Sequence, residues 1–220
     1  KSDADERPRG GVGIGGAVSV DLFGAAVVAA VLRQRELPEI YIAPFGSFVA
    51  ELLDPTYGLY QFKPQIVVLV PDFRNLVAPD DVSLDFAGIR NSLDAQVEQM
   101  TAHWRRLKTL LSCQIIQHTL YAAPERLSGV AERRWIGSRY NQLRYLNDEL
   151  INAGADLVSF VEIDHLAAHV GSLAWAADRS YHKRRLPFDP RHLIAYLPYF
   201  EAAWRAANAQ AKKALNPHVE

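Results

Sequence analysis

One short run, QIVVLV at residues 65–70, constrains the fold more than any other part of the chain. It is apolar and largely β-branched, without the polar alternation of a strand that has one face in water. A strand of this composition is buried on both faces, which occurs in parallel sheets covered by helices on either side. The run therefore predicts an α/β fold.

Strand and helix patterns alternate along the rest of the chain. We expect strands at residues 12–20, 38–44, 65–70, 113–120 and 155–163. We expect helices at residues 21–35, 45–53, 86–111, 131–152, 164–171 and 190–214, with a loop at 53–64. Alternation of this kind gives right-handed crossovers and a parallel sheet. We therefore predict a five-stranded parallel sheet in a three-layer, flavodoxin-like sandwich.

The length of 220 residues suits one domain with a single core. We expect that domain at residues 12–215, after a polar linker at 1–11 and before a short tail at 216–220. The chain begins at Lys1 rather than at a methionine, so we expect a domain excised from a longer protein.

Charge and composition exclude several classes of partner. The formal net charge is -1, which gives no reason to expect nucleic acid or a membrane surface as a partner. No apolar run reaches the ~20 residues that a membrane-spanning helix needs. The single cysteine, Cys113, lies in an apolar run, suits a reducing cytoplasm and is expected in the core.

The stretch VGIGGAVSVDLF at residues 12–23 is expected to pass directly from a buried strand into a helix. Gly11, Gly13 and Gly16 match the letters of a dinucleotide-binding fingerprint. That fingerprint requires a strand before its first glycine, whereas these glycines are expected inside the strand. We therefore expect no nucleotide cofactor, and no other cofactor in this chain.

The loops at the carboxyl edge of a parallel sheet are where such folds bind ligands. Here they carry several polar residues, and we expect a substrate site formed by Asp21, Gly46, Ser47, Asp72 and Asn75.

A second set of residues, which shares Gly46 and Asn75 with this one, is similar to the pattern of SGNH-type hydrolases. In those enzymes a serine, a glycine and an asparagine follow the first three strands, and an Asp-x-x-His pair precedes the last helix. Ser19, Gly46, Asn75, Asp189 and His192 occur here in that order. The set would support ester hydrolysis or acyl transfer. Asp189 followed by a proline is also an ordinary helix start.

Three segments resemble the amino-terminal region of FkbH-like proteins. They are the run from PEIYIAPFGSF to PDFRNL at residues 38–76, RLPFDPRHLIAYL at 185–197 and KKAL at 212–215. Members of that family are glyceryl transferase/phosphatases that load a glycerate-derived unit onto an acyl carrier protein in polyketide-type biosynthesis.

The resemblance implies an SGNH-like domain that positions the carrier or substrate for a following phosphatase domain. The family's Asp-x-Asp motif is absent from LNPHVE at residues 215–220, so no phosphatase residue carries over. Val18 stands at the best-aligned nucleophile position, and Ser19 matches a threonine of the family. The alternatives are an esterase or O-acyltransferase that uses Ser19, His192 and Asp189, and a scaffold without catalytic chemistry.

Other polar and aromatic patterns favour structural roles or leave two roles open. His165 and His169 lie four residues apart near Glu162 and Asp164, but no third metal ligand is fixed, so we expect surface histidines and no metal. The basic run HKRR at 182–185 is expected to be a solvated turn, or else to attract a phosphopantetheine phosphate or an acidic carrier protein. Tyr57, Tyr60 and Phe62 could line a pocket or pack over the sheet edge.

Overall fold

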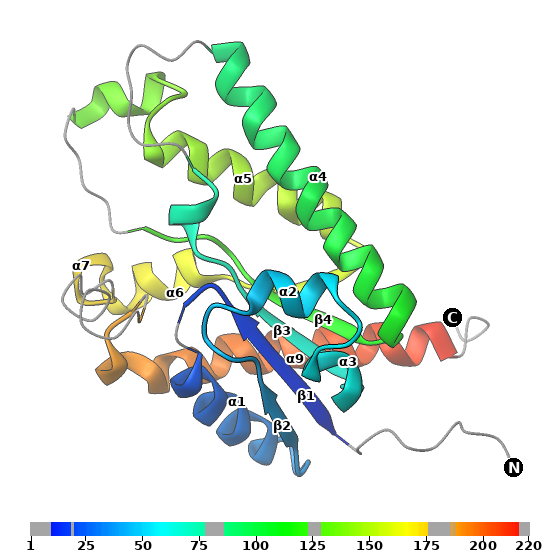
Figure 1. The fold of residues 1–220 in the computed structure, drawn as a ribbon. Helices are drawn as coiled ribbons and strands as arrows, with labels where there is room; N and C mark the ends of the chain where they lie inside the picture. Colours follow the sequence, from blue (N-terminus) through cyan, green and yellow to red (C-terminus); the bar gives the residue numbers. More distant parts are fainter. Residues whose placement is uncertain are drawn as a thin grey trace, which may run out of the picture.

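The computed structural model describes residues 10–18, 20–77, 86–122, 129–175, 186 and 188–215. The described residues form one five-stranded sheet in the order β2-β1-β3-β4-β5, in which every neighbouring pair is parallel (Figure 1). The strands are β1 (Gly11–Gly16), β2 (Glu39–Ile42), β3 (Ile66–Val70), β4 (Gln114–His118) and β5 (Val158–Val161). The predicted α/β fold with a flavodoxin-like strand order is confirmed.

The helices follow the strands in the expected alternation. The first half of the chain contributes α1 (Asp21–Arg33), α2 (Phe48–Leu53), α3 (Gly58–Phe62), η1 (Phe73–Asn75) and α4 (Phe86–Leu111). The second half contributes η2 (Gly129–Arg134), α5 (Arg139–Gly154), α6 (Ile163–Val170), α7 (Ser172–Trp175), η3 (Pro190–His192) and α9 (Leu193–Leu215). None of the helices within the described ranges is both long enough and apolar enough to cross a membrane.

The predictions differ most from the structure at three places, each for a local reason. β1 ends at Gly16 rather than at residue 20, because the chain leaves the strand there and Val18 turns into the core. The predicted loop at 53–64 contains α3, whose Leu59 amide donates to the buried Glu51 carboxylate at 2.9 Å. The helix expected from residue 131 begins only at Arg139, where the Ser138 hydroxyl accepts from the Asn141 amide.

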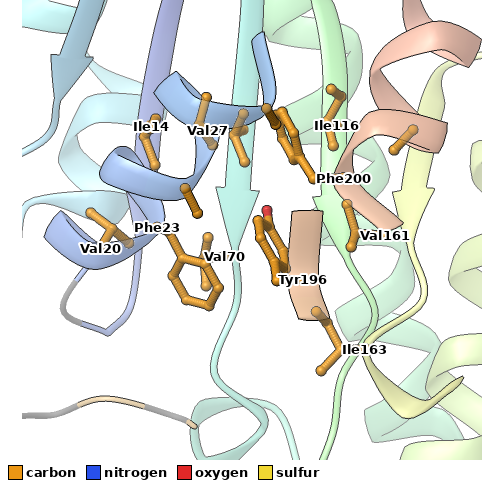
Figure 2. Close-up of a cluster of buried hydrophobic side chains, with 14 of the residues drawn as sticks. Ile14, Val20, Phe23, Val27, Val70, Ile116, Val161, Ile163, Tyr196 and Phe200 are labelled. Atoms are coloured by element: carbon orange, nitrogen blue, oxygen red, sulfur yellow. The ribbon is translucent and has the colours of Figure 1, made fainter. Parts of the chain in front are cut away.

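The sheet has a hydrophobic core on each face. On one face, α1, α6 and α9 pack against residues such as Ile14, Val70 and Val161 (Figure 2). On the other face, α2, α3, α4 and α5 pack against Val67, Leu69 and other buried residues. Both faces of β3 are therefore covered, as its continuous apolar sequence predicted.

The glycines of β1 allow the short helices α2 and α3 to lie close to the strand. A Cβ atom at Gly13 would stand 2.5 Å from Cδ1 of Leu59 in α3. A Cβ atom at Gly15 would stand 3.3 Å from the ring of Phe48 in α2. The short helices α2 and α3 can pack directly on β1 because these positions have no side chain.

A buried histidine joins β4 to α9. His118 is 3% exposed, and its Nε2 lies 2.9 Å from the hydroxyl of Tyr196, which is 0% exposed. The ring of Phe23 packs edge-on against the imidazole. Burial lowers the pKa of His118 to about 3, so the residue is neutral at pH 7.

We predict that His118 makes the fold less stable in mild acid. The unfolded chain binds a proton at this histidine below a pH of about 6.5, whereas the folded chain resists it down to about pH 3, so stability falls between these values. In the variant His118→Gln, which keeps hydrogen-bonding capacity toward Tyr196, that loss is absent. Urea unfolding should show that wild type loses about 2 kcal/mol relative to the variant between pH 7 and pH 5. Parallel pH profiles of the two proteins would contradict this account.

Candidate functional site

The strand order determines where a ligand site can form. The chain runs from β1 outward to β2 and then returns to the other side of β1 as β3. The loops after β1 and β3 therefore leave the sheet in different directions, and they leave a crevice at the carboxyl edge between them. Doubly wound folds bind ligands at this kind of crevice.

A pocket of about 370 Å³ lies at this edge, and we call it the crest pocket. Ala17 contributes from the end of β1, Gly46 from the loop after β2, and Asp72 and Asn75 from the segment after β3. The remaining lining comes mainly from α2, which supplies apolar side chains, and from α4, which supplies Gln96, Gln99, Met100 and His103. Three of the five residues expected to bind substrate thus meet in one pocket.

Gly46 and Ser47 connect β2 to α2, but only Gly46 lines the crest pocket. Gly46 has a φ of +82°, a conformation that residues with a side chain rarely adopt. The Ser47 hydroxyl donates to the Pro44 carbonyl at 2.7 Å, which directs this side chain into the turn. Gly46 therefore contributes backbone to the pocket, while Ser47 stabilises the turn that holds it.

Asp72 and Asn75 follow β3. Asp72 is 5% exposed, and its Oδ1 accepts from the Arg74 backbone amide at 3.1 Å and from Arg74 Nη1 at 3.0 Å. The carboxylate thus begins η1 and is paired with a guanidinium. Asn75 is exposed, and its side chain is available to a ligand in the pocket.

Asp189 directly precedes η3, and His192 is its last residue, directly before α9. Neither residue lines the crest pocket. The Asp189 carboxylate accepts from the Arg191 backbone amide at 3.0 Å and from Arg191 Nη2 at 2.6 Å. These hydrogen bonds lower the pKa of Asp189 to about 2, with a smaller electrostatic contribution from His192. Within the described residues, no hydrogen bond or ion pair joins the His192 ring to Asp189.

The residues at the end of β1 contribute little to the pocket. Val18 is 1% exposed and belongs to the core beneath α1. Asp21 is the exposed first residue of α1 and is not part of the pocket lining. Ser19 lies outside the described residues.

Sequence reasoning missed His103. It follows Gln96, Gln99 and Met100 by seven, four and three residues, so these four side chains share one side of α4. His103 is 9% exposed, and no described residue hydrogen-bonds to its ring. The only available signal was the spacing of Gln96, Gln99 and His103, and this spacing is not distinctive in a helix with many other polar residues.

The other motifs have structural roles where they are described. His165 pairs with Glu162, with Nδ1 3.0 Å from Oε2, and the described residues contain no cluster of three or more metal-ligating side chains. The Tyr60 hydroxyl donates to the Leu52 carbonyl, and Phe62 stacks on Tyr41, so both pack locally. Tyr57 is exposed. The basic run at 182–185 lies outside the described residues.

Comparison with known proteins supports the fold. No family model and no curated protein sequence matches the chain. Among solved structures, it is similar to the N-terminal part of protein BF1531 from Bacteroides fragilis, described as containing a phosphatase domain and as complexed with Mg. That likeness has 17% identity and a TM-score of 0.72, and it covers 90% of this chain but only 52% of the neighbour.

Two neighbours of similar length are described as esterase or lipase. The acetylxylan esterase of Geobacillus stearothermophilus has 13% identity and a TM-score of 0.58, covering 90% of this chain and 94% of the neighbour. A chain from Parabacteroides merdae, described as a GDSL-like lipase, has 11% identity and a TM-score of 0.57, covering 90% and 97%. The chain therefore has an SGNH-hydrolase-like α/β fold.

We predict that Asp72 stabilises the protein rather than binding ligand directly. Replacing it in Asp72→Ala leaves the Arg74 amide and guanidinium without this acceptor, which should cost about 1–2 kcal/mol in urea unfolding. Asp72→Asn keeps an acceptor oxygen for the amide and should cost less than half of that. An alanine variant as stable as wild type would show that the cap contributes nothing.

Proposed function

We propose that this chain is the amino-terminal SGNH-like domain of an FkbH-like protein and that it binds rather than cleaves its ligand. In this role the crest pocket positions a glyceryl unit, or the arm of the acyl carrier protein that receives it, during transfer. The phosphatase and transfer chemistry belongs to a following domain, and no cofactor binds to this chain. We expect the protein to act in the cytoplasm.

The observation that carries this proposal is the composition of the crest pocket, whose described lining does not include the Asp189 and His192 pair. The pocket lining includes Gly46 and Asn75 but neither member of that pair. The Asp189 carboxylate also accepts hydrogen bonds from the Arg191 guanidinium rather than from His192. A serine hydrolase needs its base oriented by a third group beside the nucleophile. The arrangement therefore favours a binding role for Gly46 and Asn75 over a catalytic role for Asp189 and His192.

A further observation supports a following phosphatase domain. The B. fragilis neighbour is described as containing a phosphatase domain, and this chain matches about half of its length. A protein with both parts fits the FkbH-like arrangement, in which the SGNH-like region comes first.

A second candidate function is hydrolysis or transfer of an acyl ester by Ser19, His192 and Asp189. It is favoured by the position of Asp189 and His192, three residues apart and directly before the last helix. Catalytic mutants of the acetylxylan esterase neighbour replace an aspartate and a histidine with the same spacing.

Titration with an acyl carrier protein that bears its phosphopantetheine arm tests the first proposal. Backbone NMR signals of Gly46, Asn75 and neighbouring residues should shift saturably. Val49 is 53% exposed and lines the pocket, so Val49→Glu should weaken binding about tenfold or more by placing a charge at the contact. Ile194→Glu, at an exposed position of α9, is the matched control and should leave binding unchanged. Absence of saturable shifts at the crest pocket would refute the carrier-binding role.

A fluorophosphonate probe separates the two candidates. Binding without covalent chemistry predicts no labelling of the wild-type chain, because such a probe reacts with an activated serine and this proposal assigns none. Labelling that disappears in Ser19→Ala but persists in Ser47→Ala would overturn the binding proposal and establish the hydrolase.

A further inference from the structure

His103 is a largely buried histidine in the lining of the crest pocket. Its side chain is 9% exposed, and no described residue hydrogen-bonds to its ring. Its ring nitrogens are not among the fully buried polar atoms of the described residues that lack a partner. The imidazole therefore stands in the pocket lining without a hydrogen bond to any described residue, which leaves it free to bind a ligand there.

The histidine is held in its neutral form. Burial lowers its pKa, and the positive charge of Arg106 lowers it further. Arg106 is not part of the pocket lining, and its Nη2 donates to the Leu53 carbonyl in α2 at 2.6 Å. At pH 7 the imidazole therefore offers one donor and one acceptor, which is the pattern that a hydroxyl group complements.

The rest of the polar lining has the same character. Gln96, Gln99 and Asn75 offer amide donors and acceptors without net charge. The described lining includes no lysine or arginine, and its one charged group is the Asp72 carboxylate. Such a lining lacks the cations that bind phosphate or carboxylate groups and favours uncharged hydroxyl groups.

The size and apolar part of the pocket limit the ligand further. A volume of about 370 Å³ admits a small molecule, at the lower end of ordinary ligand pockets. Phe48, Leu52 and Leu76 line it on the apolar side. A short carbon skeleton that carries hydroxyl groups matches both halves of this surface.

We infer that His103 is a ligand-binding residue whose imidazole hydrogen-bonds a hydroxyl group of an uncharged, hydroxylated small molecule in the crest pocket. The inference rests on the proposed role of this pocket in binding. It adds that the pocket binds the uncharged form of the ligand more tightly than a phosphorylated or carboxylate form, so a ligand that begins as a phosphate ester binds best after hydrolysis has removed its phosphate.

Three small compounds test the inference without any carrier protein. Methyl glycerate is neutral and has two hydroxyl groups, glycerate has the same hydroxyl groups and a negative charge, and methyl propionate is neutral without hydroxyl groups. Each is titrated into the wild-type chain while the His103 ring signal is followed by NMR. Methyl glycerate should shift this signal saturably, with an affinity in the millimolar range. Glycerate and methyl propionate should bind about tenfold more weakly or worse.

Variants assign the effect to His103. His103→Leu should weaken methyl glycerate binding at least about fivefold, and His103→Gln should restore most of it because the amide keeps a donor and an acceptor. His165→Leu, at an exposed histidine outside the pocket lining, should bind as wild type does.

Three results would overturn the inference: equal affinity for glycerate and methyl glycerate, unchanged affinity in His103→Leu, or no shift with any compound. Since no carrier is present, these outcomes are independent of whether the chain binds one.

Discussion

The absence of side chains at Gly13 and Gly15, on one face of β1, is the constraint on which the rest of the structure depends. Gly13 leaves room for Leu59 of α3, and Gly15 leaves room for the ring of Phe48 in α2. Both helices therefore lie against the strand itself. This close approach brings the loop with Gly46 over the end of the sheet, where it forms one side of the crest pocket. A larger residue at Gly13 would have to displace Leu59 and the nearby Pro64 ring.

Two aspartates, one in the lining of the crest pocket and one outside it, make the same local interactions. Asp72 and Asp189 each precede a single 3-10 turn, accept from the backbone amide two residues later and pair with an arginine at that same position. In each case the carboxylate is hydrogen-bonded to a residue only two positions further along the chain. Both were expected to act on a substrate, and both instead have a sufficient structural explanation. The open polar groups of the crest pocket are His103 and the neutral amides around it.

Much of the fold could be predicted from the sequence because its signals are local. The continuous apolar run of β3 and the helical spacing of α4 each require only nearby residues to interpret. α3 could not be predicted this way, because Glu51 stabilises its first turn from a preceding helix. The site was found in part for the same reason: Gly46, Asp72 and Asn75 follow strands, whereas His103 reaches the pocket from the middle of a 26-residue helix. Its role depends on how far α4 extends along the sheet edge, which the sequence does not state.

A crystal structure of the chain with methyl glycerate tests the central claim most directly, that the crest pocket holds its ligand without covalent chemistry. The account predicts an intact ligand between α2 and α4, with a hydroxyl group within hydrogen-bonding distance of the His103 ring. Density for a glyceryl group bonded to Ser19, or an empty crest pocket with the ligand beside His192, would contradict it.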